Sequence, residues 1–336
     1  MFLSFTPDLL VFQRQSRLTA NLKTRVEQTS REAVTGKRED ITTAVHGAVG
    51  DIHLLQKALD DIEQGGRIND ISGARLDLMT TSLASVRGVV GGLDTQALAA
   101  LTTPNSIGIS TISQQSEANL RSVISLLNTS HGNRKLFSGD TSDKLPLATA
   151  ETLLADVKNI MQTSGSPSNI KIALNTYFND PNGGFATNIY KGGSNNAPPS
   201  FLSDGSKIEF SVRADDQSIR ETLRGLAVLA TAQSTGFDVQ SSAFNSVFTQ
   251  GASSVSQGKG GLIKLESGLG IYSGLLENAN TQQQAEKLTL AKSLNSITGR
   301  DQFEAAAELK QLQTELESSY LITSRLANLH LTNFLR

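Results

Sequence analysis

The distribution of proline constrains the fold of this 336-residue chain more than any other feature of its sequence. Only Pro7 and Pro104 lie before residue 140, and no proline follows Pro199. Proline breaks helix interiors because it lacks a backbone donor and clashes with the preceding turn. Both ends of the chain can therefore form long helices, and turns are expected between residues 140 and 216, where the other five prolines lie.

Apolar residues recur at helical spacing in the N-terminal part. Leu18, Leu22 and Val26 predict a helix over about residues 10–35, which Gly36 is expected to end. Further helices are predicted over about residues 51–100, with weak points at Gly65-Gly66 and Gly91-Gly92, and over 106–130.

The last helix has the clearest pattern in the chain. Asp301 precedes Glu304 by three residues, which is typical of a capping box at a helix start. After it, residues step by four and three in alternation, which predicts a heptad seam with a polar second half. The seam residues are Ala305, Leu309, Leu312, Leu316, Ser319, Thr323 and Leu326.

The middle of the chain differs in character. Alternating residues predict one strand over 207–213 and a second over 185–190, and two short helices are expected over 151–161 and 169–178. From residue 217 the pattern is helical again. Within that stretch an interruption is expected at Gly258–Gly261, with a bend in a continuous helix as the alternative, and a further interruption is expected at Gly299.

Together these patterns predict a mainly α fold, with long antiparallel helical stems, similar to a coiled coil, formed by both chain ends and a small α+β insert between them. Five segments follow from this interpretation. They are an N-terminal assembly helix (1–40), the N-terminal half of the helical stem (41–139), an outward insert domain (140–216), the C-terminal half of the stem (217–300) and a C-terminal assembly helix (301–336).

Composition excludes several classes of function. The net charge of -2 gives no field to attract nucleic acid or an anionic membrane, so neither is expected as a partner. The absence of cysteine excludes thiol catalysis and thiolate zinc sites. No apolar run approaches about 18 residues, so no membrane span is predicted, and the N-terminus lacks the pattern of a cleaved signal peptide.

Enzyme motifs are weak throughout, and no catalytic residue, cofactor or metal is predicted. His46 and His53 are seven residues apart, but surface positions explain them better than a metal site does. Gly251 and Gly258-Lys259 have the wrong spacing for a phosphate-binding loop. Asp215-Asp216 is expected to cap the helix that starts at Gln217.

Four stretches carry a resemblance to one family. Residues 301–336 resemble the ending of flagellins and of the hook-associated protein 3 family. Residues 132–139 (GNRKLFSG) resemble the element that closes the first helical half in that family, with Lys135 in place of a tyrosine. Tyr190-Lys191-Gly192-Gly193 resembles its Tyr-x-Gly-Gly element, and Thr35-Gly36-Lys37-Arg38 resembles the element after its first helix, with Asp40 the one remnant of the usual acidic pair.

These stretches follow one another in an order similar to that in the flagellin superfamily. The chain resembles the hook-associated protein 3 family most of all. The resemblance implies a structural subunit of the flagellum that is exported through the flagellar type III apparatus and lies outside the cell. Its implied partners are hook-associated protein 1, flagellin, further copies of itself and a cytoplasmic export chaperone. The implied assembly interface comprises Leu18, Leu22, Val26, Leu309, Leu312, Leu316, Leu326, Leu331, Phe334 and Leu335.

Two alternatives remain open at this point. A filament flagellin would share the terminal helices and differ in copy number, since a junction needs few copies and a filament needs thousands. A secreted or surface enzyme with its site in the insert would retain an activity in that insert alone.

Overall fold

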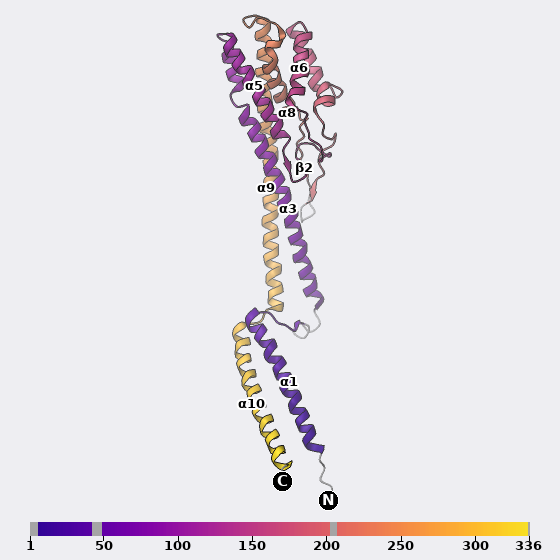
Figure 1. Ribbon diagram of the computed structural model, residues 1–336, viewed down its shortest axis with the longest axis vertical. Coiled ribbons are helices and arrows are strands. Elements are labelled where there is room, and N and C mark those ends of the chain that lie inside the picture. The colour runs from indigo at the N-terminus through magenta and orange to yellow at the C-terminus, as the bar shows by residue number, and fades with distance from the viewer. Residues whose placement is uncertain (1–5, 42–48, 202–206, 335–336) are drawn as a thin grey trace. The chain divides into compact units, whose positions relative to one another are not determined.

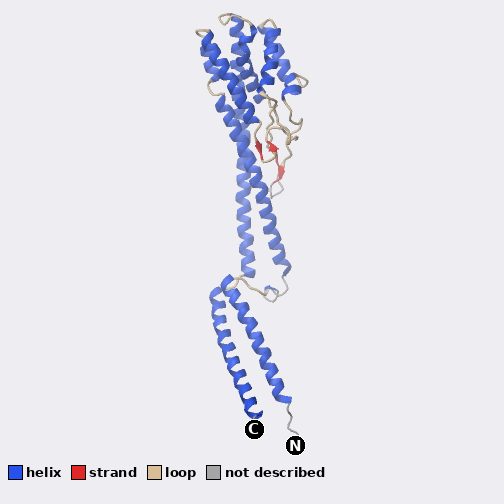
Figure 2. Cartoon of the chain, viewed as in Figure 1, coloured by secondary structure: helices blue, strands red, loops and turns tan. Residues whose placement is uncertain are grey.

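The computed structural model describes residues 6–41, 49–201 and 207–334, which divide into two compact units (Figure 1). Unit 1 comprises residues 1–63 and 284–336, and unit 2 comprises residues 64–283. Helices dominate the described residues, and their strands form two short pairs (Figure 2). The predicted mainly α fold with a small α+β insert is confirmed.

Unit 1 contains both chain ends. Helices α1 (Thr6–Thr35) and α10 (Gln302–Phe334) lie side by side (Figure 1). The start of α3 (Val49–Val89) and the end of α9 (Ser242–Thr298) also belong to this unit. The predicted cap of the last helix is confirmed, because Oδ1 of Asp301 accepts the backbone N–H groups of residues 303 and 304 at 2.8 and 3.2 Å.

Unit 2 is built around a large apolar core. Within it α3 runs antiparallel to α9, α5 packs against α8, and α4 packs against α5. Phe137, Leu226 and Phe244 are among its fully buried side chains. The remaining helices of this bundle are α4 (Leu93–Ala100), α5 (Ser106–Leu127), α8 (Gln217–Thr231) and the 3-10 helix η2 (Ala232–Thr235).

The insert belongs to the same core. Leu153, Phe178 and Ile189 are fully buried in it, and α6 packs against α8. Its helices are α6 (Ala150–Thr163), α7 (Pro167–Asn179) and the π-helix η1 (Phe185–Ile189). Two antiparallel pairs complete the region, β1 (Ser130–His131) with β2 (Arg134–Lys135) and β3 (Ser200–Phe201) with β4 (Lys207–Ile208).

Both predicted strands need correction. Residues 185–189 form a π-helix, because helical spacing buries Phe185 and Ile189 together in the core, and the N–H of Tyr190 donates to the carbonyl of Phe185 at 2.8 Å. Of the strand predicted over 207–213, only the first two residues pair in a ladder. Farther along, the N–H of Ala214 donates to the carbonyl of Phe137 at 2.9 Å instead.

The interruption predicted at Gly258–Gly261 is wrong, because α9 is helical from Ser242 to Thr298. These glycines permit close approach of α8. A Cβ atom on Gly258 would lie 2.2 Å from Oγ1 of Thr222, and one on Gly261 would lie 2.3 Å from Oγ of Ser218. The helix tolerates them because its partner fills the space of the missing side chains.

Elsewhere glycine does end helices. Gly92 has a φ of 77° and separates α3 from α4, as the weak point at Gly91-Gly92 predicted, whereas Gly65-Gly66 lies within an unbroken α3. The interruption predicted at Gly299 is confirmed, since α9 ends at Thr298 and α10 starts at Gln302. The predicted cap at Asp216 is also present, with its Oδ1 accepting the N–H of Ser218 at 2.8 Å.

Candidate assembly interface

The face of α10 that packs on α1 follows the heptad pattern of the sequence. Ala305, Leu312 and Ser319 are buried, with Leu312 only 2% exposed. Leu309 and Leu316, which alternate with them, are half-buried. The predicted seam therefore lies inside the chain's own pair of terminal helices.

The facing side of α1 follows the same steps of four and three. Thr29 is buried, and Leu22 and Val26 are half-buried along the seam. Leu18 lies off this line and is 55% exposed, so it does not share the seam with Leu22 and Val26. The sequence pattern did contain the missed polar members, since Gln15, Thr19 and Thr29 stand at the same steps from Leu22 and Val26.

The seam is polar at the end nearer the chain termini. Oγ of Ser319 lies 2.6 Å from Oγ1 of Thr19 and accepts a hydrogen bond from Nε2 of Gln15 at 3.0 Å. A polar residue at a core position specifies register but weakens a coiled coil. This end of the pair is therefore matched in register and gains little from apolar burial.

Part of the predicted interface lies beyond what the structure describes at side-chain level. Leu335 lies outside the described residues. Leu326, Leu331 and Phe334 fall within the backbone of α10, and their side chains are not described. The assembly role of all ten residues stays a prediction.

Large apolar side chains also occur on the outward faces of both terminal helices. Phe303 is 90% exposed, and Tyr320, Leu321 and Ile322 are three consecutive exposed residues on α10. Single exposed apolar residues are common, but a run of three exposed apolar residues on a helix is unusual unless that surface has a function. The exposed set is Leu10, Phe12, Leu18 and Val34 on α1 and Phe303, Tyr320, Leu321 and Ile322 on α10.

A backbone joint, formed by residues 36–39 and 298–302, fixes the end of α1 against the start of α10. Gly36, with a φ of 66°, ends α1, and its carbonyl accepts the N–H of Arg300 at 2.9 Å. The N–H of Arg38 donates to the carbonyl of Thr298 at 2.8 Å, and Lys37 pairs with Gly299 as an antiparallel bridge. The resemblance element at Thr35–Arg38 therefore pairs with the segment that precedes the last helix.

Charged side chains surround this joint. The carboxylate of Glu32, which is buried, accepts the N–H of Glu39 at 3.0 Å and lies 3.8 Å from the guanidinium of Arg300. Arg25 binds Glu308 at 3.1 Å, and Arg300 binds the other oxygen of the same carboxylate. The pair of Arg25 with Glu308 is exposed, so it contributes at most about 1 kcal/mol and serves mainly to set the geometry of the helix pair.

Two further resemblance elements meet inside unit 2. The N–H of Gly193 donates to the carbonyl of Ser138 at 2.8 Å, and the hydroxyl of Tyr190 donates to the carbonyl of Gly193 at 2.8 Å. A Cβ on Gly193 would lie 1.6 Å from Oδ1 of Asp140, so any larger residue here would displace that carboxylate. Burial, and the nearby carboxylate of Asp215, raise the pKa of Tyr190 to about 12. The elements at 132–139 and 190–193 thus form one packed structural unit.

The histidines and acidic residues of the described segments are the candidate metal ligands. Across 6–41, 49–201 and 207–334 no group of three or more His, Asp or Glu side chains is placed to hold a metal ion. His53 is exposed on α3, and His46 lies outside the described residues. No helix in the described part of the chain is long and apolar enough to cross a membrane.

The sequence and the structure were compared with known proteins. Residues 255–335 match the family model for the bacterial flagellin C-terminal helical region, and this stretch covers α9 from residue 255 to its end and all of α10. No curated protein sequence matches the chain.

Two solved structures share the fold. FlgL from Bacillus cereus superposes with a TM-score of 0.52 at 18% identity, over 72% of this chain and 99% of its own. A flagellar hook-associated protein from Vibrio parahaemolyticus superposes with a TM-score of 0.54 at 12% identity, over 74% of this chain and 96% of its own. At these identities the likeness is one of fold.

Proposed function

We propose that this protein is a structural subunit of the bacterial flagellum that joins hook-associated protein 1 to the filament by helical packing of its terminal helices. The observation that carries the proposal is the exposed apolar set on the outward faces of α1 and α10, in a region that matches the flagellin C-terminal model. The fold shared with FlgL and with a flagellar hook-associated protein supports the same class of subunit. The protein acts through these surfaces and not as an enzyme.

The structure of unit 1 supports a packing role. The seam holds α1 and α10 together, the joint fixes their ends, and the exposed apolar set faces away from the pair. A surface that packs against a different surface of the next copy forms a head-to-tail array, which grows as an open helix when the rotation does not close. Copies of this chain, hook-associated protein 1 and flagellin are the partners that such an array requires at the junction.

The route to the cell exterior follows from the same proposal. The flagellar type III apparatus exports the chain, and a cytoplasmic chaperone binds the last helix before export. Helices of this kind gain most of their stability from packing partners. A chaperone on α10 would cover Leu321 and its exposed neighbours until the assembled flagellum covers them.

Filament flagellin is the second candidate, because the matching family model is that of flagellin itself. Both candidates use the same terminal helices, so the geometry of unit 1 does not separate them. They differ in where the subunit lies and in how many copies one flagellum contains.

Immunogold electron microscopy of purified flagella tests both candidates. A junction subunit gives one narrow band of label where hook meets filament, and deletion of its gene leaves hooks without filaments and flagellin in the medium. Label along the whole filament would favour flagellin. Flagella without any label would contradict both roles.

A further inference from the structure

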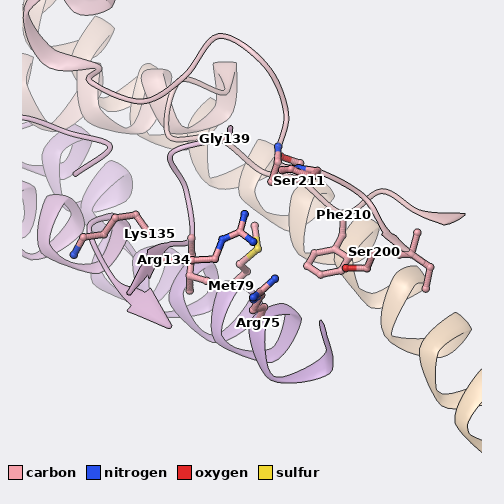
Figure 3. A pocket seen from close by; sticks show the side chains of 12 residues that line it. Arg75, Met79, Arg134, Lys135, Gly139, Ser200, Phe210 and Ser211 are labelled. Atoms are coloured by element: carbon pink, nitrogen blue, oxygen red, sulfur yellow. The ribbon is translucent and has the colours of Figure 1, made fainter. Parts of the chain in front are cut away.

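A small cavity of about 40 Å³ lies in unit 2 between α3, the hairpin of β1 and β2, and the segment around β3 and β4 (Figure 3). Arg75 of α3 and Arg134 of β2 line it together with Met79, Ser200, Phe210 and Ser211. In Figure 3 the guanidinium groups of Arg75 and Arg134 both lie beside Met79, whereas the ammonium of Lys135 points away from them. Two cations therefore face a common space.

Neither guanidinium has an acidic partner among the described residues. No described carboxylate lies within 4.0 Å of either group, although most other arginines of unit 2 bind one, such as Arg87 with Glu266 at 2.9 Å. Nε of Arg75 is buried and has no hydrogen-bond partner within the part of the chain that the structure describes. Burial and the charge of Arg134 lower the pKa of Arg75, as expected where like charges meet without a counter-charge.

The walls of the cavity are fixed and partly apolar. Met79 and Ile208 are buried, and Phe210 is half-buried. Oγ of Ser72 donates to Oγ of Ser200 at 3.0 Å, and Oγ of Ser211 accepts the N–H of Ala197 at 3.1 Å. Guanidinium groups beside apolar walls attract an anion more strongly than they would in open water.

The size of the cavity limits what it can hold. One water-sized probe needs about 10–15 Å³, so this cavity admits about three such centres. That is room for the two oxygens of a carboxylate and not for a large ligand. Guanidinium groups bind carboxylates through paired, charge-assisted hydrogen bonds.

We propose that this cavity is a receptor for one carboxylate group, supplied by an Asp or Glu side chain of a neighbouring copy of this chain or by a free organic acid. The assignment rests on the two guanidinium groups, the lack of a counter-charge for them among the described residues, and the volume. It does not depend on the flagellar role.

Thermal unfolding of the full-length protein tests the binding. Sodium acetate is compared with sodium chloride at equal ionic strength, because a ligand that binds only the native state raises Tm in a saturable way. The wild type should show an acetate-specific rise in Tm that saturates at millimolar concentration. Arg134→Gln should weaken this response at least tenfold, and Arg134→Lys should retain only part of it.

Lys158→Gln is the matched control, since it removes one positive charge from an exposed position of the same unit. It should keep the full acetate response. NMR of the arginine Nε–H signals provides a readout that does not depend on how a variant folds, and acetate should shift the signals of Arg75 and Arg134 in the wild type. An equal response to phosphate, or equal losses in Arg134→Gln and Lys158→Gln, would contradict a carboxylate receptor.

Sedimentation velocity separates the two sources of the carboxylate. If a neighbouring copy supplies it, the wild type self-associates, acetate competes with this association, and Arg134→Gln is monomeric. If a free acid supplies it, the wild type is monomeric and still responds to acetate. If the wild type shows no acetate response and no self-association that requires Arg134, the proposal is overturned.

Discussion

The two units of this chain differ in how much apolar surface each removes from water. Among the described residues of unit 1, the buried apolar side chains are Ile52, Ile62, Ala305 and Leu312. Unit 2 has a large main core from Leu76 of α3 to Leu269 of α9, which contains all the fully buried phenylalanines among the described residues. Since burial of apolar surface is the main favourable term in folding, unit 2 has the means to fold alone, and unit 1 depends far more on neighbours.

The contrast also appears in what each unit leaves exposed. In unit 1 the seam buries residues with hydroxyl groups, such as Thr29 and Ser319. The apolar side chains of Leu321 and Phe303 are exposed to water. A single chain gains nothing from such an arrangement. It becomes favourable when further subunits cover the exposed side chains, so the weakness of unit 1 in isolation is consistent with an assembly role.

Limited proteolysis of dilute protein should show the largest difference between the units. Proteases act on segments that open locally, and helices with few buried contacts open most readily. We expect α1 and α10 to be cut first and a resistant fragment of about residues 64–283 to persist. Mass spectrometry of the fragments identifies the cut sites, and early cleavage within α8 would show that the units do not differ in this way.

Leu312→Asp should disrupt unit 1 and leave unit 2 folded. Leu312 is 2% exposed, and its burial is worth about 1.5–3 kcal/mol, which the variant loses while placing a charge in the seam. Circular dichroism should show a loss of helix at low temperature, with an unchanged Tm for the main transition. Gln313→Asp adds the same charge one position away, at an exposed site, and should behave as wild type.

Leu321→Asp tests the outward face of α10 without changing the seam. Because Leu321 is 60% exposed, the variant should keep the helix content and stability of the free chain. It should nevertheless block incorporation into flagella, measured by motility and electron microscopy. Thr314→Asp adds a charge one heptad earlier on the same face without removing an apolar side chain, and it should assemble nearly normally. Normal filaments from Leu321→Asp would show that this face has no partner.

The sequence predicted most of the helices, because their apolar residues repeat every three or four positions. It failed where a contact distant in sequence decides the local structure. Gly258 appeared to be a helix breaker, since nothing in the sequence shows that Thr222 fills its space. The alternation at 185–190 suggested a strand, although burial of both Phe185 and Ile189 requires helical spacing.

The candidate interface was predicted in part for the same reason. Periodicity placed Leu312 and Leu316 on the seam, but it also suggested Leu18, which is exposed. The polar seam residues Gln15, Thr19 and Ser319 contribute through mutual hydrogen bonds, which an apolar pattern does not detect. The carboxylate receptor combines Arg75 and Arg134 from distant segments, and no spacing rule brings such residues together.

Gly258→Ala should destabilise unit 2 by overpacking. The added Cβ would lie 2.6 Å from the backbone nitrogen of Thr222, so α8 and α9 must separate, at about 1–3 kcal/mol. Gly260→Ala is the control, because no atom of the described residues would lie within 4 Å of a Cβ at that site. It should raise stability by up to about 1 kcal/mol through helix propensity. Urea denaturation measures both, and equal shifts would contradict the close packing of α8 on α9.

The smallest expected effect concerns pH and Tyr190 of unit 2. Burial raises the pKa of this phenol to about 12, above its ordinary value of 10.0, so the folded state favours the protonated form. The stabilisation is fully present below pH 10 and is lost as the pH rises towards 12. Denaturation curves between pH 8 and 12 should therefore show a constant stability followed by a decline.

Tyr190→Phe should make that decline smaller, because phenylalanine does not ionise. At neutral pH the variant should lose about 1 kcal/mol with the hydrogen bond from the hydroxyl to the carbonyl of Gly193, which measures 2.8 Å. Part of the decline should remain, since burial also raises the pKa of Tyr177, whose hydroxyl donates to Asp156 at 2.7 Å. Tyr320→Phe changes an exposed tyrosine of unit 1 and should retain the wild-type profile. If Tyr190→Phe also retained it, the packing of the 190–193 element against Ser138 would not control the alkaline stability of unit 2.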